Sequence, residues 1–155
     1  MSHRNQTSQQ AGTGARVTAV GRHPEKLASL EARGVETCPA GTFDPASANA
    51  DLVVEATGSP LGFEQAIAAT RPRGILVLKS TVAERLQLDL APLVINEIQV
   101  VGSRCGPFAP ALDALAQGRV SVAPLVSETF PLARATQALS RAGEPGILKV
   151  LIDCS

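Results

Sequence analysis

Residues 51–78 read DLVVEATGSPLGFEQAIAATRPRGILVL, and this stretch decides the fold. It opens with a β-branched apolar strand over residues 51–56. It closes with an apolar run over residues 74–78, typical of a strand buried on both faces. Between them lies an Ala-rich segment, residues 61–70, in which Phe63 and Ile67 stand four apart on one helical face. A strand, a helix and a strand of these lengths predict a right-handed crossover between two parallel strands.

The same alternation extends on both sides of this stretch. Toward the N-terminus the pattern predicts a strand, a helix and a brief strand over residues 16–21, 24–33 and 35–38. Toward the C-terminus it predicts a strand, a helix, an extended segment, a helix and a final strand over residues 98–103, 108–117, 125–130, 131–141 and 147–152. We therefore expect an α/β fold, a Rossmann-like doubly wound parallel sheet. The polar, Gly-rich residues 1–15 predict a disordered tail, which leaves residues 16–155 as one domain.

The composition excludes several classes of function. Fourteen Lys and Arg balance fourteen Asp and Glu, so no net field attracts nucleic acid or an anionic membrane. No apolar run approaches the roughly 20 residues that span a bilayer. The three cysteines lie far apart and form no C-x-x-C pair, which favours the reducing cytoplasm and predicts no metal ligands.

In doubly wound sheets, ligands bind beyond the carboxyl ends of the strands. The strand over residues 16–21 ends at Gly21, Arg22 follows, and Lys26 lies one turn into the next helix. A dinucleotide-binding sheet usually places at this strand end a carboxylate that holds the adenosine ribose hydroxyls. Here that carboxylate is absent, and the positive charges of Arg22 and Lys26 favour binding of a ribose 2′-phosphate. The sequence therefore favours NADP over NAD. The alternative is that Arg22 and Lys26 are only solvated surface charges.

Three further strand ends supply the other candidate residues: Thr57, Gly58 and Ser59, then Leu78, Lys79 and Ser80, then Arg104. The first group is a small-residue turn that lets a ribose approach the backbone, although an ordinary turn with Ser59 as helix N-cap is the simpler interpretation of this segment alone. The second group offers backbone groups to a nicotinamide amide, with Lys79 otherwise solvated. Arg104 is placed to reach a pyrophosphate.

In order and spacing, these segments resemble the zinc-type medium-chain dehydrogenase/reductases, the superfamily of alcohol, sorbitol and threonine dehydrogenases. The resemblance covers about residues 14–153 and is carried by residues 17–27, 51–59, 73–78, 101–106 and 118–150. It implies the C-terminal cofactor-binding part of an NAD(P)-dependent alcohol dehydrogenase-like oxidoreductase, with a nicotinamide dinucleotide as partner. The family also implies that strand 98–103 pairs two copies in a homodimer.

The resemblance implies a role for each candidate residue. Gly21, Arg22 and Lys26 would meet the adenosine ribose or its phosphate. Residues 57–60 would line the cofactor cleft, residues 78–80 would meet the nicotinamide, and Arg104 would face the diphosphate.

The departures from the family pattern concern the N-terminal side. The family's catalytic zinc ligands belong to a GroES-like domain that has no counterpart here, and the Gly-rich phosphate loop and the central first strand are missing as well. We therefore expect an N-terminally truncated sheet in which strands 16–20 and 35–38 do not pair with strand 51–56. We expect weak binding of NADP or NAD, no catalytic residue, no zinc ligand, and no hydride transfer by this chain alone.

Two other functions stay open at this point. The chain could be a non-catalytic half-domain that pairs through its sheet edge with a partner. It could also be an unrelated small α/β enzyme that uses Cys105 or Lys79, although nothing in the sequence places a base beside either residue.

Overall fold

The computed structural model describes residues 14–81, 88–144 and 146–155, and its elements fall into two units. The central unit is Asp44–Ala111, and the terminal unit combines Met1–Phe43 with Leu112–Ser155. Most of the tail predicted over residues 1–15 lies outside the described residues, so that prediction and the domain division that depends on it stay untested.

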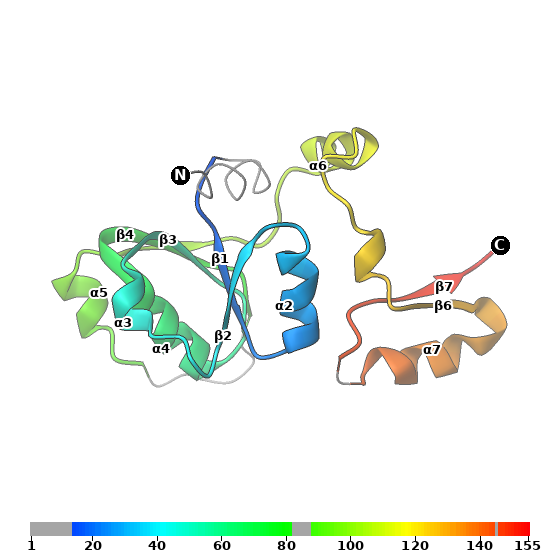
Figure 1. Cartoon of the computed structure of the whole chain (residues 1–155), viewed down its shortest axis with the longest axis horizontal. Helices are drawn as coiled ribbons and strands as arrows, with labels where there is room; N and C mark the ends of the chain where they lie inside the picture. Colours follow the sequence, from blue (N-terminus) through cyan, green and yellow to red (C-terminus); the bar gives the residue numbers. More distant parts are fainter. Residues whose placement is uncertain (1–13, 82–87, 145) are drawn as a thin grey trace. The chain divides into compact units, whose positions relative to one another are not determined.

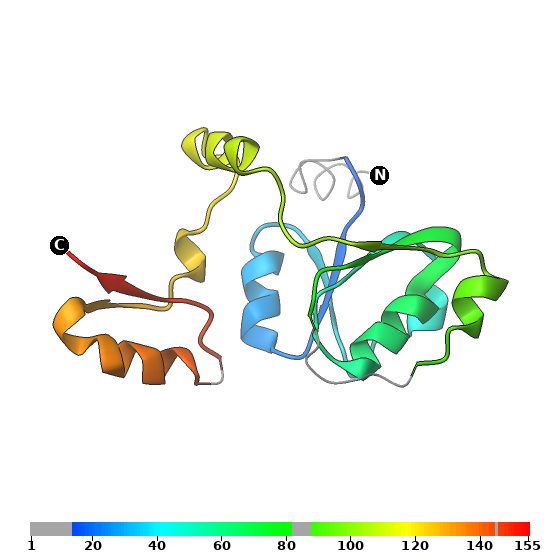
Figure 2. The same cartoon turned by 180° about the vertical axis from the view of Figure 1, so that it is seen from behind.

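The central unit is built on three parallel strands, β3 (Ala50–Glu55), β4 (Thr70–Leu78) and β5 (Gln99–Gly102), which the described residues pair in the order β3-β4-β5. The helices α3 (Pro45–Ala48), α4 (Pro60–Ala69) and α5 (Ala91–Ile95) accompany them. Figure 1 and Figure 2 show these helices together on one face of the sheet. The predicted α/β fold with parallel strands is confirmed.

The core of this unit lies between α4 and the sheet. Phe63, Ala66 and Ile67 come from α4 and pack with Ile98 and with Leu76, which is fully buried in β4. Side chains alternate between the two faces of a sheet along each strand. Leu76 and its register partner Val53 therefore face α4, whereas Val77 and its partners point to the opposite face. Burying this one apolar stripe fixes α4 on the sheet.

The opposite face of the sheet carries apolar side chains that remain exposed. Leu52 and Val54 in β3 are each 53% exposed, and Val101 in β5 is 45% exposed. Val54, Val77 and Val101 occupy register positions that place them on this one face. Helix α4 thus covers one apolar face of this sheet, while the opposite face exposes apolar side chains.

Strand β4 starts four residues earlier than predicted. The sequence indicates a helix to residue 70 and a strand from residue 74, but Thr70 is already extended and begins β4. The pairing with β3 shifts register between Ala50 and Leu52, and Arg73 adopts a φ of 62°. The Arg73 N–H donates to the Asn96 carbonyl at 2.7 Å, which offsets part of the cost of that left-handed conformation.

The terminal unit contains two shorter parallel pairs. The first comprises β1 (Thr18–Gly21), α2 (Pro24–Glu31) and β2 (Glu36–Pro39). The second comprises β6 (Glu128–Pro131), α7 (Ala135–Ala142) and β7 (Val150–Asp153). Helix α6 (Phe108–Ala116) spans the division between the units, and 3-10 turns cover Ala123–Leu125 and Leu132–Arg134. The strands β1 and β2 pair with each other in parallel, with Thr18 opposite Glu36 and Gly21 opposite Pro39.

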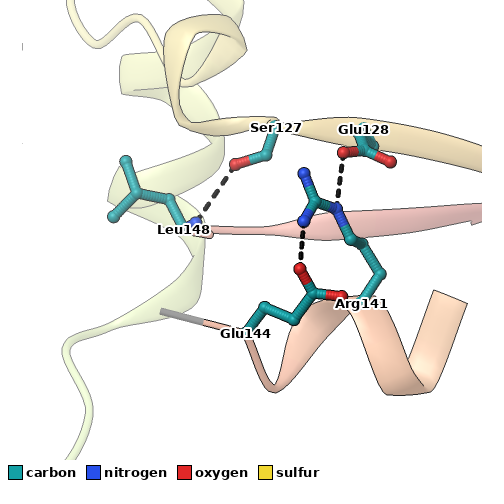
Figure 3. Close-up of polar contacts among 5 residues, drawn as sticks. All are labelled: Ser127, Glu128, Arg141, Glu144 and Leu148. Atoms are coloured by element: carbon teal, nitrogen blue, oxygen red, sulfur yellow. Dashed lines mark hydrogen bonds and ion pairs between the residues drawn. The ribbon is translucent and has the colours of Figure 1, made fainter. Parts of the chain in front are cut away.

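Arg141 ties the second pair together, as Figure 3 shows. Its Nε donates to Glu128 Oε1 at 2.7 Å, and its Nη1 donates to Glu144. The hydrogen bonds that Arg141 donates to these two carboxylates raise its pKa. The Leu148 N–H donates to Ser127 Oγ at 3.1 Å, so one arginine and one serine join α7, β6 and the segment before β7.

The C-terminal elements are displaced from their predicted bounds. The helix predicted over residues 131–141 begins as a 3-10 turn, and α7 starts only at Ala135, because Pro131 at the end of β6 is still extended at ψ 154°. The last strand starts at Val150 instead of residue 147. Within the described residues, no helix has both the length and the apolar composition needed to cross a membrane.

Candidate functional site

The strand ends of the central unit meet at one edge of the sheet. The Lys79 N–H donates to the Glu55 carbonyl at 2.9 Å, and the Ser103 N–H donates to the Leu78 carbonyl at 2.9 Å. The residues that follow β3, β4 and β5 therefore leave the sheet side by side. Seven predicted site residues gather there: Thr57, Gly58, Ser59, Leu78, Lys79, Ser80 and Arg104.

Glu55, the last residue of β3, holds this edge together. Its side chain is buried, at 4% exposure, yet carries an ionisable carboxyl group. Its Oε1 accepts from the Thr57 N–H at 2.6 Å, the Thr57 hydroxyl at 2.6 Å and the Gly58 N–H at 3.2 Å. Its Oε2 accepts from the Ser80 hydroxyl. One carboxylate thus binds the turn after β3 and Ser80, which lies two residues after the end of β4.

These hydrogen bonds set the charge of Glu55. Burial by itself would raise the pKa of this carboxyl group. The donors from Ser80, Thr57 and Gly58 favour the charged form, and together they lower the pKa below its ordinary value. Glu55 is therefore an ionised, hydrogen-bonded carboxylate at neutral pH.

The turn between β3 and α4 has a constrained shape. Gly58 adopts a φ of +67°, which suits glycine. The Ser59 hydroxyl caps α4 by accepting from the Gly62 N–H at 3.1 Å. A Cβ on Gly62 would lie 1.9 Å from Thr57 Oγ1, so the Thr57 side chain lies directly against the glycine backbone. Ser59 is the helix N-cap that the sequence predicted.

Sequence reasoning missed Glu55 and Gly62. The signal for Glu55 was present, because a carboxylate closes an apolar strand immediately before a turn of small residues. Its partner Ser80 lies 25 residues away and becomes visible only when β4 is placed beside β3. Gly62 gave no signal, since one glycine in the first turn of a helix has no special sequence meaning.

Lys79 and Arg104 are brought together at the ends of β4 and β5. The Lys79 Nζ donates to the Arg104 backbone carbonyl at 2.8 Å, while both residues remain exposed. Lys79 is therefore anchored by a hydrogen bond as well as solvated.

Gly21, Arg22 and Lys26 belong to the terminal unit, so the ten predicted residues form two groups. The Gly21 carbonyl accepts from the Ala40 N–H at 2.8 Å, and a Cβ on Gly21 would lie 3.0 Å from Leu27 Cδ2. Gly21 thus lets α2 approach the end of β1 closely. Arg22 is exposed and Lys26 is half-buried at the start of α2.

The described residues do not form a zinc site. Across the described ranges, no three His, Cys, Asp or Glu side chains lie close enough together to hold a metal ion. A hollow of about 370 Å³ in the central unit lies at the opposite edge of the sheet, where residues such as Asn49, Thr70 and Asn96 precede or start the strands. None of the predicted site residues lines that hollow.

Comparison with known proteins gives a consistent set of likenesses. The model of the zinc-binding dehydrogenase family matches residues 10–117. Mouse sorbitol dehydrogenase is 33% identical over 106 residues, which are 67% of this chain and 30% of that protein.

Two solved structures share the fold at low identity. A zinc-binding dehydrogenase from Sinorhizobium meliloti 1021, bound to NADP, superposes with a TM-score of 0.82 and 22% identity over 96% of this chain and 48% of that one. A structure described as a short chain alcohol dehydrogenase, from Escherichia coli CFT073 in complex with NADH, gives a TM-score of 0.81 and 18% identity over 96% and 48%. The chain therefore spans about a third of the curated relative's length and about half of each of these two structures.

Proposed function

This chain belongs to the zinc-binding dehydrogenase family, and from that premise we propose that it is the cofactor-binding portion of an NAD(P)-dependent alcohol dehydrogenase-like oxidoreductase. A nicotinamide dinucleotide supplies or accepts hydride when bound, and the protein supplies binding and orientation. The observation that carries the proposal is the gathering of seven predicted residues at the carboxyl edge of the sheet, where Thr57, Gly58 and Ser80 donate hydrogen bonds to the Glu55 carboxylate. Ligands of open α/β sheets bind at this edge.

Each group of residues has a proposed role. The turn at Thr57–Ser59 lines the cofactor cleft, and the backbone of residues 78–80 faces the nicotinamide. Arg104 binds the diphosphate, and the hydrogen bond from Lys79 to the Arg104 carbonyl holds the local backbone in place.

We infer a preference for NADP from the end of β1. The position of Gly21 carries no carboxylate, and the Arg22 side chain is exposed to solvent. A guanidinium binds a phosphate bidentately, and Lys26 adds a second positive charge one turn into α2. The two solved relatives were bound to NADP and to NADH, so the family alone does not decide between the cofactors.

We propose that this chain alone does not oxidise alcohols. Zinc-binding relatives use a metal, whereas the described residues form no site for one. Cys38, Cys105 and Cys154 carry free thiols, which supports a reducing, cytoplasmic location.

Titration of the chain with NADPH and NADH, followed by nicotinamide fluorescence, tests the proposal. We expect saturable binding of both, tighter for NADPH. Replacing Arg22 by Ser should reduce the preference for NADPH about tenfold, because a charge-assisted pair to the 2′-phosphate is lost. Arg16→Ser is the matched control, since Arg16 is exposed and precedes β1 at its other end. Absence of saturable binding to either cofactor would contradict the proposed function.

A second function, that of an interaction module, is favoured by one observation. All four residues of β5 are exposed, and this strand has no partner on its outer side in the described residues. An unpaired apolar edge is a template for another strand. Self-association through strand 98–103 is compatible with cofactor binding.

A further inference from the structure

The turn between β3 and α4 has the construction of an anion site. Two successive backbone N–H groups, those of Thr57 and Gly58, point to one position just before a ten-residue helix. Such groups at a helix N-terminus attract phosphates and carboxylates. In this chain the position is already taken by Glu55 Oε1.

The carboxylate also fixes the direction of the surrounding hydroxyl groups. A carboxylate can only accept, so the hydroxyls of Thr57 and Ser80 donate to Glu55. With its proton committed, Thr57 Oγ1 accepts from the Ser59 N–H at 3.2 Å and from the Ser59 hydroxyl at 3.1 Å. The Thr57 hydroxyl therefore has no capacity left for a ligand.

Ser80 is left in a different condition. Its hydroxyl proton is committed to Glu55 Oε2, but no other described residue donates a hydrogen bond to its oxygen, which has two lone pairs, and the residue is half-buried just after β4. Ser80 can thus accept a hydrogen bond and cannot give one.

We propose that Glu55 is the internal anion of this turn, a positioning residue that excludes phosphate and makes Ser80 an acceptor for a hydroxyl or amide N–H of the ligand. The identification of that ligand as a nicotinamide dinucleotide rests on the proposed function. The occupation of the anion position by Glu55 is argued from this chain's contacts alone, and it can be tested without cofactor.

The first test measures hydrogen exchange and inorganic phosphate binding at the Thr57 and Gly58 amides by NMR of the full chain. In Glu55→Ala we expect both amides to exchange at least fivefold faster and to shift on phosphate addition, because their acceptor is gone. Wild type and Glu64→Gln, which removes an exposed carboxylate from α4, should show neither change. A role in stability alone would not create a phosphate site, so the absence of phosphate shifts in folded Glu55→Ala overturns the proposal.

The Glu55→Gln variant keeps the question decidable if Glu55→Ala does not melt cooperatively. Its neutral amide accepts weaker hydrogen bonds, so the Thr57 and Gly58 amides should still exchange about fivefold faster than in wild type. Rates equal to those of wild type overturn the proposal.

The second test compares cofactor binding by Ser80→Ala and Thr57→Val. If wild type binds NADPH, Ser80→Ala should bind about fivefold more weakly, since the ligand loses an acceptor, and Thr57→Val should retain more affinity than Ser80→Ala. The reverse order overturns the assignment of Ser80. If wild type binds neither cofactor, the proposed function fails, while exchange and phosphate shifts still decide the role of Glu55.

Discussion

At the scale of the residue, Glu55 is the one buried charge among the described residues of the central unit, and its partners determine how that charge is stabilised. A buried carboxylate is costly unless it is hydrogen-bonded. Here Thr57, Gly58 and Ser80 supply donors to both oxygens. The charge is therefore stabilised by groups that a ligand would otherwise meet.

The first prediction concerns acid stability. The folded-state pKa of Glu55 lies below its ordinary value, which is about 4.3 in an unfolded chain. Its contribution to the free energy of unfolding is present above that unfolded value and is lost as pH falls through the folded pKa. In circular dichroism melts, the melting temperature of wild type should exceed that of Glu55→Gln near neutral pH. The difference between the two melting temperatures should shrink below about pH 4.

The control for this prediction is Glu64→Gln, which removes a charge that is exposed on α4. Its melts should follow wild type at every pH. A Glu55→Gln curve that stays parallel to wild type into strong acid would mean that the carboxylate charge contributes nothing to stability.

Residue types at strand ends were predictable, but their interactions were not. The small turn at Thr57–Ser59 and the N-cap role of Ser59 follow from local rules. The role of Glu55 depends on Ser80, which only tertiary pairing brings near. For the same reason the sequence predicted that Thr57 contacts a ligand, although hydrogen bonds with Glu55 and Ser59 use the full hydrogen-bonding capacity of its hydroxyl.

At the scale of the element, the entry to β4 departs most from local rules. Thr70 leaves α4 and starts the strand at once, its hydroxyl donating to the Ala66 carbonyl at 2.7 Å. The segment Arg71–Arg73 resembles a helix stop, yet it forms part of β4. Pairing with β3 and the bond from Arg73 to Asn96 override the local signal.

Gly74 should be intolerant of any side chain. A Cβ there would lie 2.8 Å from Thr70 Cγ2, 2.9 Å from the Arg71 carbonyl oxygen and 3.1 Å from the Asp51 carbonyl oxygen. Backbone atoms cannot move aside cheaply, so Gly74→Ala should lower the free energy of unfolding by about 1–3 kcal/mol. Urea denaturation measures the change. Gly102→Ala is the control, because a Cβ at Gly102 meets nothing within 4 Å, and equal stability of the two variants would contradict the prediction.

At the scale of the whole molecule, strand and helix alternation predicted the parallel α/β arrangement of the elements. Apolar periodicity identifies elements and their order because it records which faces are buried. It carries no information on which sheet edges a second chain covers. The exposed apolar residues of β3 and β5 are the surface that a second chain could cover.

The last prediction is that the chain self-associates through β5. Gln99–Gly102 is exposed along its length, with Val101 45% exposed and no strand on its outer side among the described residues. Pairing this edge with a second copy would satisfy its backbone groups and bury its valines. Val101→Lys places two like charges beside each other across a twofold contact and should shift sedimentation velocity profiles toward monomer.

The control variant separates the strand edge from the sheet face. Leu52→Lys makes a similar apolar-to-charged change on the same open face but on β3, the far strand of the sheet. If copies pair through β5, Leu52→Lys should associate like wild type. Dissociation by both variants would assign the contact to the apolar face instead. Wild type that sediments as a monomer at all accessible concentrations would contradict self-association, because a free apolar edge would then be tolerated in water without a partner.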